Sequence, residues 1–103
     1  MEPRILYEQY PNNNEYISSY IQYQKKYEKD ARQSDMRLIE LVSHILAERS
    51  ATSGPLRLLD IGCSTGNLLI HLKNAFPSLH LTGGDLSDLS IASCRNNPAL
   101  AGV

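Results

Sequence analysis

The chain has 103 residues, enough for one domain with a single modest core, and it carries 10 basic against 11 acidic residues. Only three basic residues follow residue 50, so no face for binding nucleic acid is expected there. The two cysteines lack metal-site spacing, and no apolar run approaches the roughly 18 residues of a membrane span. No leader pattern is found either, and the sequence therefore predicts a cytoplasmic protein without a membrane segment or a metal.

Residues 1–50 are expected to form a helical region of their own. A turn at residues 11–14 precedes a helix in which tyrosines recur at spacings of four, three and four. These tyrosines are Tyr16, Tyr20, Tyr23 and Tyr27. A second helix is expected to begin near Ser34 or Asp35 and to run to about Arg49.

The tyrosine stripe permits two interpretations. The rings can pack against the rest of the protein and leave their hydroxyl groups at the rim, which is the favoured interpretation. Alternatively, the helix is a lid over a ligand site, with a tyrosine touching the bound molecule. The spacing alone does not decide between packing and a lid.

The second region, residues 51–103, begins with a short apolar run that has the character of a buried parallel strand. This strand, over residues 56–61, carries Asp60 near its end and is followed by a loop with Gly62 and Gly66. A helical pattern with its apolar side chains on one face opens directly after the loop. The pattern predicts a strand, a glycine loop and a helix in direct succession.

A second strand-like run over residues 79–82 leads to another acid, Asp85. A further helix is expected over residues 87–96, and residues 99–103 look like the approach to a third strand. Strand, glycine loop, helix, strand and terminal acid form a βαβ unit, which binds nucleoside-containing ligands at the carboxyl edge of its sheet. The sequence therefore predicts an α/β fold with a nucleoside site at this edge.

The spacing of the glycines narrows the choice of ligand. A dinucleotide fingerprint counted from Gly62 needs glycines at positions 64 and 67, which hold Ser64 and Asn67. A phosphate-binding P-loop also needs glycine at position 67, followed by lysine, and Leu68 stands there instead. What remains is the pattern Asp-x-Gly-x-x-x-Gly, which starts at Asp60.

This pattern resembles the first motif of the class I S-adenosylmethionine-dependent methyltransferases, which is commonly Asp/Glu-x-Gly-x-Gly-x-Gly. Asp60, Gly62 and Gly66 match that motif, and Ser64 stands in place of the middle glycine. The replacement is a mild departure, because small residues are tolerated at this position.

Residues 81–87 resemble the second motif of the same family, which places an acid at the end of the second strand. Asp85 matches that acid, whereas Gly84 replaces a residue that is more often β-branched and is expected to weaken the end of the strand. The resemblance covers about residues 56–96, which is under half of the chain.

The resemblance implies S-adenosyl-L-methionine as the cofactor. An acid before the first glycine can face the ammonium group of the methionine end, and the glycines let the backbone approach the ligand closely. Asp85 can accept hydrogen bonds from both ribose hydroxyls. The implied cofactor-binding residues are Asp60, Gly62, Cys63, Gly66, Asp85 and Leu86.

Other chemically reactive side chains carry weaker signals. Cys63 and Cys94 are expected to be reduced structural thiols, the three histidines are expected to be structural or surface residues, and no catalytic base is predicted. Arg32 is expected in a surface ion pair, although it could instead reach the carboxylate of the methionine end.

The resemblance implies a Rossmann-like methyltransferase fold, with a mostly parallel sheet covered by helices on both faces. This chain supplies only the N-terminal helices and the first βαβα portion of that sheet, so an N-terminal fragment of the enzyme is expected, inactive on its own. Such a fragment is expected to associate with itself through its unpaired strand edge. The implied methyl acceptor is a small molecule. The alternative is a non-enzymatic nucleoside-binding or assembly module that a partner chain completes.

Overall fold

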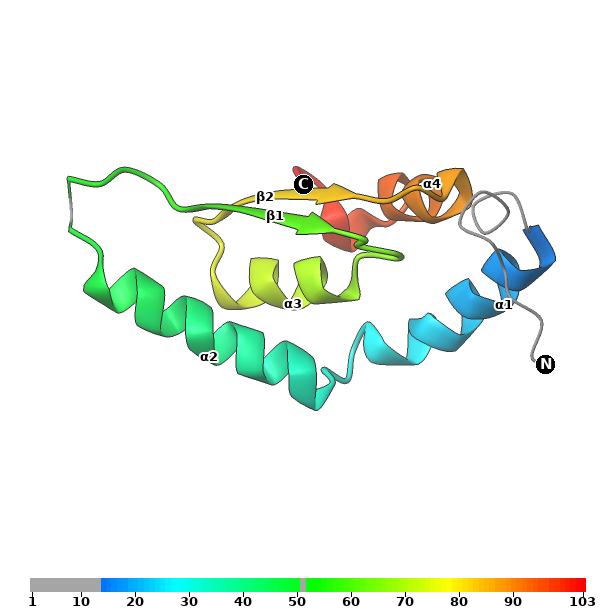
Figure 1. The fold of residues 1–103 in the computed structure, drawn as a ribbon, viewed down its shortest axis with the longest axis horizontal. Coiled ribbons are helices and arrows are strands. Elements are labelled where there is room, and N and C mark those ends of the chain that lie inside the picture. The colour runs from blue at the N-terminus through cyan, green and yellow to red at the C-terminus, as the bar shows by residue number, and fades with distance from the viewer. Residues whose placement is uncertain (1–13, 51) are drawn as a thin grey trace, which may run out of the picture.

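The computed structural model describes residues 14–50 and 52–103, and most of the turn predicted at residues 11–14 lies outside the described residues. Helices and strands alternate along the second half of the chain (Figure 1). In chain order the elements are α1 (Asn14–Gln24), the 3₁₀ helix η2 (Lys25–Tyr27), α2 (Gln33–Glu48), β1 (Arg57–Ile61), α3 (Asn67–Ala75), β2 (His80–Gly84), α4 (Asp88–Arg95) and the 3₁₀ helix η3 (Pro98–Leu100).

The two strands form a parallel sheet, and α3 is the crossover between them. The register runs from Arg57 opposite His80 to Ile61 opposite Gly84, so both strands end at the same edge. Helix α3 lies against one face of the sheet, and α2 passes along the outer side of α3 (Figure 1). The protein is therefore α/β, and the predicted succession of strand, glycine loop, helix and strand is confirmed.

The core lies between the sheet, α3 and the helices on either side of it. Leu69 and Leu72 of α3 are each 1% exposed, because residues three apart share one face of a helix. Burying a leucine fully contributes about 1.5–3 kcal/mol relative to leaving it in water. The core consists of Val42, Cys63, Leu69, Ile70, Leu72, Leu79, Leu81 and Leu100.

The opposite face of the sheet is uncovered by any described residue. Side chains alternate across a strand, so Leu58 turns toward the core while Leu59 and Ile61 turn away from it. Leu59 is 60% exposed and Ile61 is 82% exposed, and Leu86, just after β2, is 75% exposed. The structure therefore presents an apolar sheet face of the kind that usually packs against another element.

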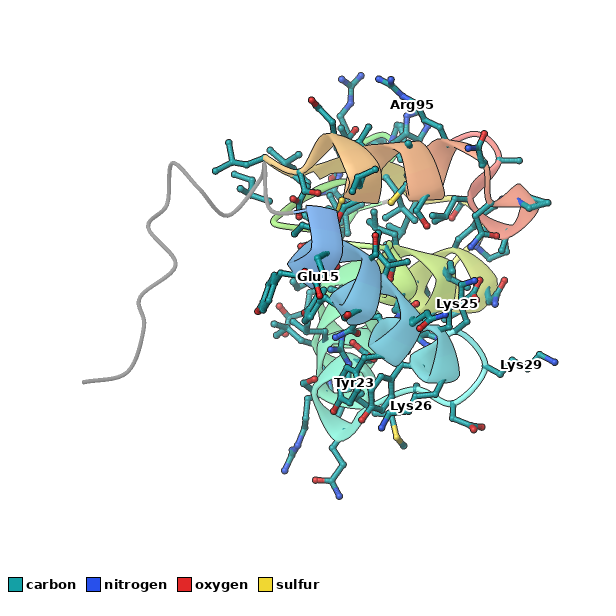
Figure 2. All side chains as sticks on the ribbon, turned by 90° about the vertical axis from the view of Figure 1, so that its right-hand side faces the viewer. Glu15, Tyr23, Lys25, Lys26, Lys29 and Arg95 are labelled. Atoms are coloured by element: carbon teal, nitrogen blue, oxygen red, sulfur yellow. The ribbon has the colours of Figure 1, made fainter. Side chains whose placement is uncertain are left out.

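The tyrosine stripe is not the buried face of α1, and the favoured packing interpretation is wrong for two of its members. Tyr16 and Tyr23 are exposed, whereas Ile17 and Gln24, seven residues apart on one helix line, are buried. Figure 2 shows Tyr23 on the outer side of this segment together with the neighbouring lysines. The Lys26 ammonium lies 4.3 Å from the centroid of the Tyr23 ring.

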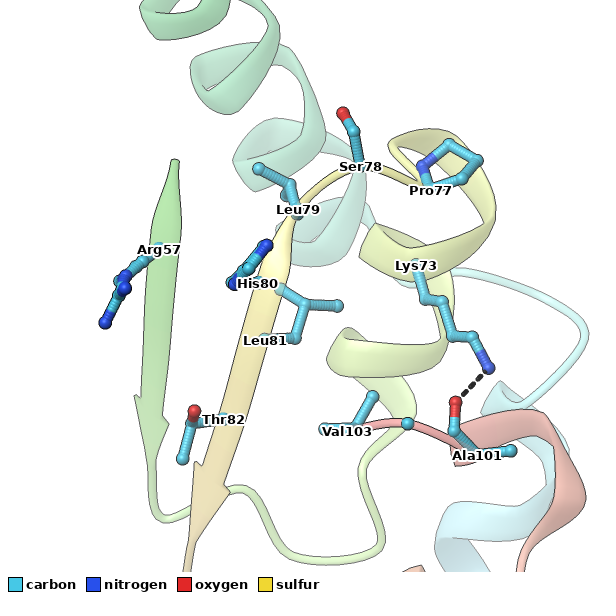
Figure 3. Close-up of a pocket in the computed structure, with 11 residues that line it drawn as sticks. Arg57, Lys73, Pro77, Ser78, Leu79, His80, Leu81, Thr82, Ala101 and Val103 are labelled. Atoms are coloured by element: carbon cyan, nitrogen blue, oxygen red, sulfur yellow. Dashed lines mark hydrogen bonds between the residues drawn. The ribbon is translucent and has the colours of Figure 1, made fainter. Parts of the chain in front are cut away.

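The expected approach to a third strand is instead the short helix η3. The Lys73 ammonium donates to the carbonyl oxygens of Ala99 and Ala101 at 3.2 and 2.6 Å, which fixes the chain after Pro98 against α3 (Figure 3). A cavity of about 580 Å³ separates the unpaired edge of β2 from Val103 and its neighbours. The last residues therefore run beside β2 without pairing with it.

The two glycines of β2 give a matched test of packing. A Cβ atom at Gly83 would lie 2.7 Å from Leu69 Cδ1 and 3.0 Å from Cys63 Sγ, whereas nothing lies within 4 Å of one at Gly84. We expect Gly83→Ala to lower the free energy of unfolding by about 1–3 kcal/mol through overpacking. Gly84→Ala is expected to leave it unchanged or to raise it by up to about 1 kcal/mol. Urea denaturation of both variants is the measurement, and equal stabilities would contradict this packing.

Candidate functional site

The loop after β1 is a tight turn held against the end of β2. The backbone N–H groups of Gly62 and Cys63 both donate to the carbonyl oxygen of Gly84, at 2.7 and 3.0 Å. Gly62 and Gly66 have φ of 81° and 83°, in the left-handed region that favours glycine. Ser64 is the only non-glycine with positive φ in the described part of the chain, at 51°. The position where the motif usually has its middle glycine therefore still adopts a conformation that suits glycine.

Asp85 fastens this loop to the start of α4. Its Oδ2 accepts from the backbone N–H of Ser64 at 2.9 Å, and its Oδ1 accepts from that of Ser87 at 2.8 Å. Ser87 in turn caps α4, because its Oγ accepts from the backbone N–H of Ser90. Each carboxylate oxygen keeps a further lone pair, so Asp85 can hold the loop and still accept hydrogen bonds from a ligand.

A cavity of about 200 Å³ lies where the N-terminal helices meet the loop. Tyr20, Arg32 and Asp35 line it from the N-terminal side, and Asp60 and Gly62 line it from the sheet side. The two regions that the sequence separated thus build one site. Tyr20 is the member of the tyrosine stripe that lines this cavity.

The structure brings together some of the implied cofactor-binding residues and leaves others apart. Asp60, Gly62 and Cys63 line the cavity, and Asp85 contacts the loop beside it. Gly66 does not line it, and its Cβ position would lie 2.6 Å from Leu100 Cδ1, so this close contact and its φ of 83° together favour a glycine there. Leu86, the residue after Asp85, is exposed and does not line the cavity either.

Hydrogen bonds that were not predicted from the sequence dock the N-terminal segment onto α3. Asn67 Nδ2 donates to the backbone oxygen of Gln24 at 2.7 Å and to its Oε1 at 3.3 Å. His71 Nε2 bonds the backbone oxygen of Tyr27 at 2.7 Å, which confirms a structural histidine. One sequence signal could have indicated this docking. Gln24 follows Ile17 by seven residues on the buried side of α1, and a polar side chain there needs a buried hydrogen-bond partner.

Three buried side-chain oxygen atoms around the loop have no hydrogen-bond partner among the described residues. They are Ser64 Oγ, Thr65 Oγ1 and Asn67 Oδ1. All three residues line the cavity, and Thr65 and Asn67 are only 7% and 3% exposed. Because buried polar atoms are nearly always paired, these oxygens indicate a place where a polar ligand or water completes the structure.

Negative charge accumulates at the cavity. The pKa of Asp60 is raised above its ordinary value, first because burial disfavours the charged carboxylate and then because Asp35 and Asp85 add negative potential. The Arg32 guanidinium opposes this rise. Ionisation of Asp60 is thus less favourable than in water, and a positively charged ligand group beside it would favour the ionised form.

The raised pKa of Asp60 makes a prediction about stability and pH. Because the pKa is higher in the folded than in the unfolded state, ionisation of Asp60 opposes folding at pH values above the unfolded pKa. Asp60→Asn is therefore expected to raise the melting temperature at pH 7, and the difference is expected to shrink as the pH falls toward the unfolded pKa. Asp88→Asn, at an exposed position in the first turn of α4, is the control. A lower melting temperature for Asp60→Asn at pH 7 would contradict a raised pKa of Asp60 in the folded protein.

Both cysteines are reduced and pack behind the loop. Cys94 Sγ donates to the carbonyl oxygen of Ser64 at 3.0 Å, and burial raises the pKa of the Cys63 thiol to about 12. A thiol with so high a pKa is a poor nucleophile, and the structural role expected for both cysteines agrees with these contacts. Among residues 14–50 and 52–103, no three metal-ligating side chains cluster, and no helix is long and apolar enough to cross a membrane.

Comparison with known proteins finds segments of three methyltransferases that are similar to this chain. No protein-family model matches it, and no solved structure matches it at a significant level. Release factor glutamine methyltransferase of Deinococcus radiodurans is 36% identical over 64 residues, which are 62% of this chain and 23% of that protein. Malonyl-[acyl-carrier protein] O-methyltransferase of Bacillus cereus is 36% identical over 55 residues, 52% of this chain and 20% of that protein. The protein of that name from Bacillus anthracis is 33% identical over 54 residues, again 20% of its length.

The chain therefore spans about a fifth of the length of the curated relatives that it matches. The similar segment is long enough to contain the strand, the glycine loop and the crossover helix together. The two motifs and these relatives show that the chain is related to the class I S-adenosylmethionine-dependent methyltransferases, whose N-terminal portion it resembles.

Proposed function

We propose that this chain is the N-terminal part of a cytoplasmic methyltransferase that uses S-adenosyl-L-methionine and methylates a small molecule. The observation that carries the proposal is the pair of acids, Asp60 and Asp85, at the adjacent carboxyl ends of two parallel strands around a left-handed glycine loop. This arrangement is the one expected for a nucleoside-containing ligand at the edge of a parallel sheet.

The residues at the cavity suit the chemistry of this cofactor. Asp60 can face the positively charged methionine end, and nothing lies within 4 Å of a Cβ at Gly62, so a ligand can approach its backbone. The free lone pairs of Asp85 can accept from the two ribose hydroxyls. The unpaired oxygens of Ser64 and Thr65 offer further hydrogen bonds.

The cofactor would supply an activated methyl group. That methyl group would pass to a nucleophilic atom of the acceptor, with the thioether as the leaving group. The contribution of residues 14–103 would be to bind and orient the donor, because in-line transfer depends mainly on near-attack geometry. No residue of the chain is assigned as a base.

We further propose that residues 1–50 form a helical lid and that residues 51–103 begin a larger Rossmann-like sheet. The uncovered face at Leu59 and Ile61 and the unpaired edge of β2 support the larger sheet, because parallel sheets are normally covered on both faces. Contacts to the adenine ring and to the acceptor would then come from strands that follow. Without those contacts the isolated chain would be inactive. Its exposed sheet face and strand edge would also make it prone to self-association, which sedimentation of the purified 103 residues would detect.

The same uncovered face also favours a second candidate function, a nucleoside-binding or assembly module completed by a partner chain. Binding and turnover separate the two candidates. The full-length protein is dialysed against tritium-labelled S-adenosylmethionine, with NAD and ATP as competitors, and is then incubated with a small-molecule extract. We expect binding that neither nucleotide displaces and label transferred into the small-molecule fraction. Binding without transfer to any acceptor would favour the module, and no binding of S-adenosylmethionine would overturn the proposed methyltransferase.

A further inference from the structure

Arg32 is held at the cavity by one buried carboxylate. Its backbone N–H donates to Asp35 Oδ2 at 3.0 Å, its Nε to the same oxygen at 3.2 Å and its Nη2 to Asp35 Oδ1 at 3.2 Å. The Asp35 side chain is 2% exposed and that of Arg32 is 36% exposed. Arg32 does form an ion pair, as expected, but the pair is not on the surface, because the Asp35 carboxylate is buried. The two side-chain hydrogen bonds fix the plane of the guanidinium group.

The neighbouring ion pair on α2 shows what an ordinary surface pair looks like. Arg37 and Glu40 have the same spacing of three residues, but their charged atoms are 3.9 Å apart and their side chains are 85% and 61% exposed. A pair of that kind contributes little to stability. Asp35 differs in two ways: it accepts from the Arg32 backbone N–H in a capping box at the start of α2, and its burial carries a desolvation penalty that the ion pair offsets.

Arg32 lines the cavity and keeps N–H groups that do not bind Asp35. A guanidinium has five N–H donors, and Asp35 takes two of them, one on Nε and one on Nη2, so three remain. Arg32 lines the same cavity as Asp60 and Ser64, and its guanidinium carbon lies 5.4 Å from the centroid of the Tyr27 ring. The cavity therefore offers a fixed cation and an anion, Asp60, to one ligand.

We propose that Asp35 is a positioning residue that orients Arg32 to bind the α-carboxylate of the cofactor's amino-acid end, while Asp60 faces the α-ammonium group. This inference rests on the proposed function and adds to it a specific anchor from the N-terminal region. A planar guanidinium matches a carboxylate in two parallel hydrogen bonds, and Asp35 keeps that plane from turning. The unpaired hydroxyl of Ser64 is a further donor at the same cavity.

The test uses two ligands that differ in the amino-acid end. S-adenosylhomocysteine has that end, and methylthioadenosine has the same nucleoside and a neutral thioether without it. In the full-length protein, Arg32→Gln is expected to weaken S-adenosylhomocysteine roughly 10- to 100-fold and to leave methylthioadenosine unchanged. Asp35→Asn is expected to produce a smaller loss with the same ligand dependence. Arg37→Gln and Glu40→Gln, on the exposed pair, are the controls and should change neither affinity.

A double variant keeps the test decisive if Arg32→Gln destabilises the protein by leaving Asp35 buried without its partner. Because Asp35 acts through Arg32, the pair Arg32→Gln/Asp35→Asn should bind no more weakly than Arg32→Gln alone. Equal losses for both ligands would show a merely structural role and overturn the inference, as would unchanged binding of S-adenosylhomocysteine. If the unaltered protein binds neither ligand, the proposed function fails and this inference fails with it.

Discussion

Replacing Gly62 by valine is expected to abolish S-adenosylmethionine binding by the full-length protein. Gly62 adopts φ of 81°, which a β-branched residue tolerates poorly, and its Cβ direction points into open space beside Asp60. Two methyl groups would occupy the space proposed for the methionine end, and displacing a bound ligand by even 1 Å can cost about 100-fold in function. Calorimetric titration with S-adenosylmethionine measures the effect.

Gly54 provides the matched control for this substitution. It has φ of 76° and likewise has nothing within 4 Å of its Cβ direction, but it lies before β1, outside the residues that line the cavity. Gly54→Val therefore carries the same backbone strain without entering the site. Loss of binding in both variants would attribute the effect to strain, and retained affinity in Gly62→Val would show that the loop does not face the ligand.

Replacing Asp85 by alanine is expected to weaken S-adenosylmethionine by about 1.5–3 kcal/mol, or roughly one to two decades in affinity. The variant loses the proposed acceptor of the ribose hydroxyls. It also frees the backbone N–H groups of Ser64 and Ser87, so the loop loses a restraint and the melting temperature should fall as well. Titration and thermal unfolding are measured on the same sample.

Asp88→Ala is the control for Asp85→Ala. Asp88 is exposed in the first turn of α4, where its charge complements the helix dipole and touches neither the loop nor the cavity. We expect it to leave the affinity within about twofold of the unaltered protein, since surface substitutions usually shift free energies by less than about 0.5 kcal/mol. If Asp88→Ala weakened binding more than Asp85→Ala did, the assignment to the ribose would be wrong.

The regular elements of the second half could be predicted because their signals are local. The apolar run before Asp60, the glycines that interrupt the pattern and the apolar face after Asn67 each depend on neighbouring residues. Strand β1 and helix α3 accordingly lie where the pattern indicated, within a residue. The short helix η3 was missed because Lys73, which holds it through Ala101, lies far away in the sequence.

The candidate site was predicted only in part, because half of it depends on tertiary docking. Spacing identified the acids and the glycines, but nothing periodic marks the hydrogen bonds between Gln24 and Asn67 that bring the N-terminal segment to the loop. Asp35 was recognised only as the start of a helix, although its carboxylate faces Arg32 at the cavity. The tyrosine spacing was misleading, since exposed aromatic rings can recur at helical intervals as regularly as buried ones.

The loop between β1 and α3 is the proposed S-adenosylmethionine site. The most direct measurement is an amide nuclear magnetic resonance titration of the full-length protein with S-adenosylhomocysteine. We predict saturable shifts at the amides of Gly62, Ser64 and Asp85, with Gly54 unmoved although it shares the backbone conformation of Gly62. Saturable binding that leaves Gly62, Ser64 and Asp85 unshifted, or no binding at all, would contradict the account.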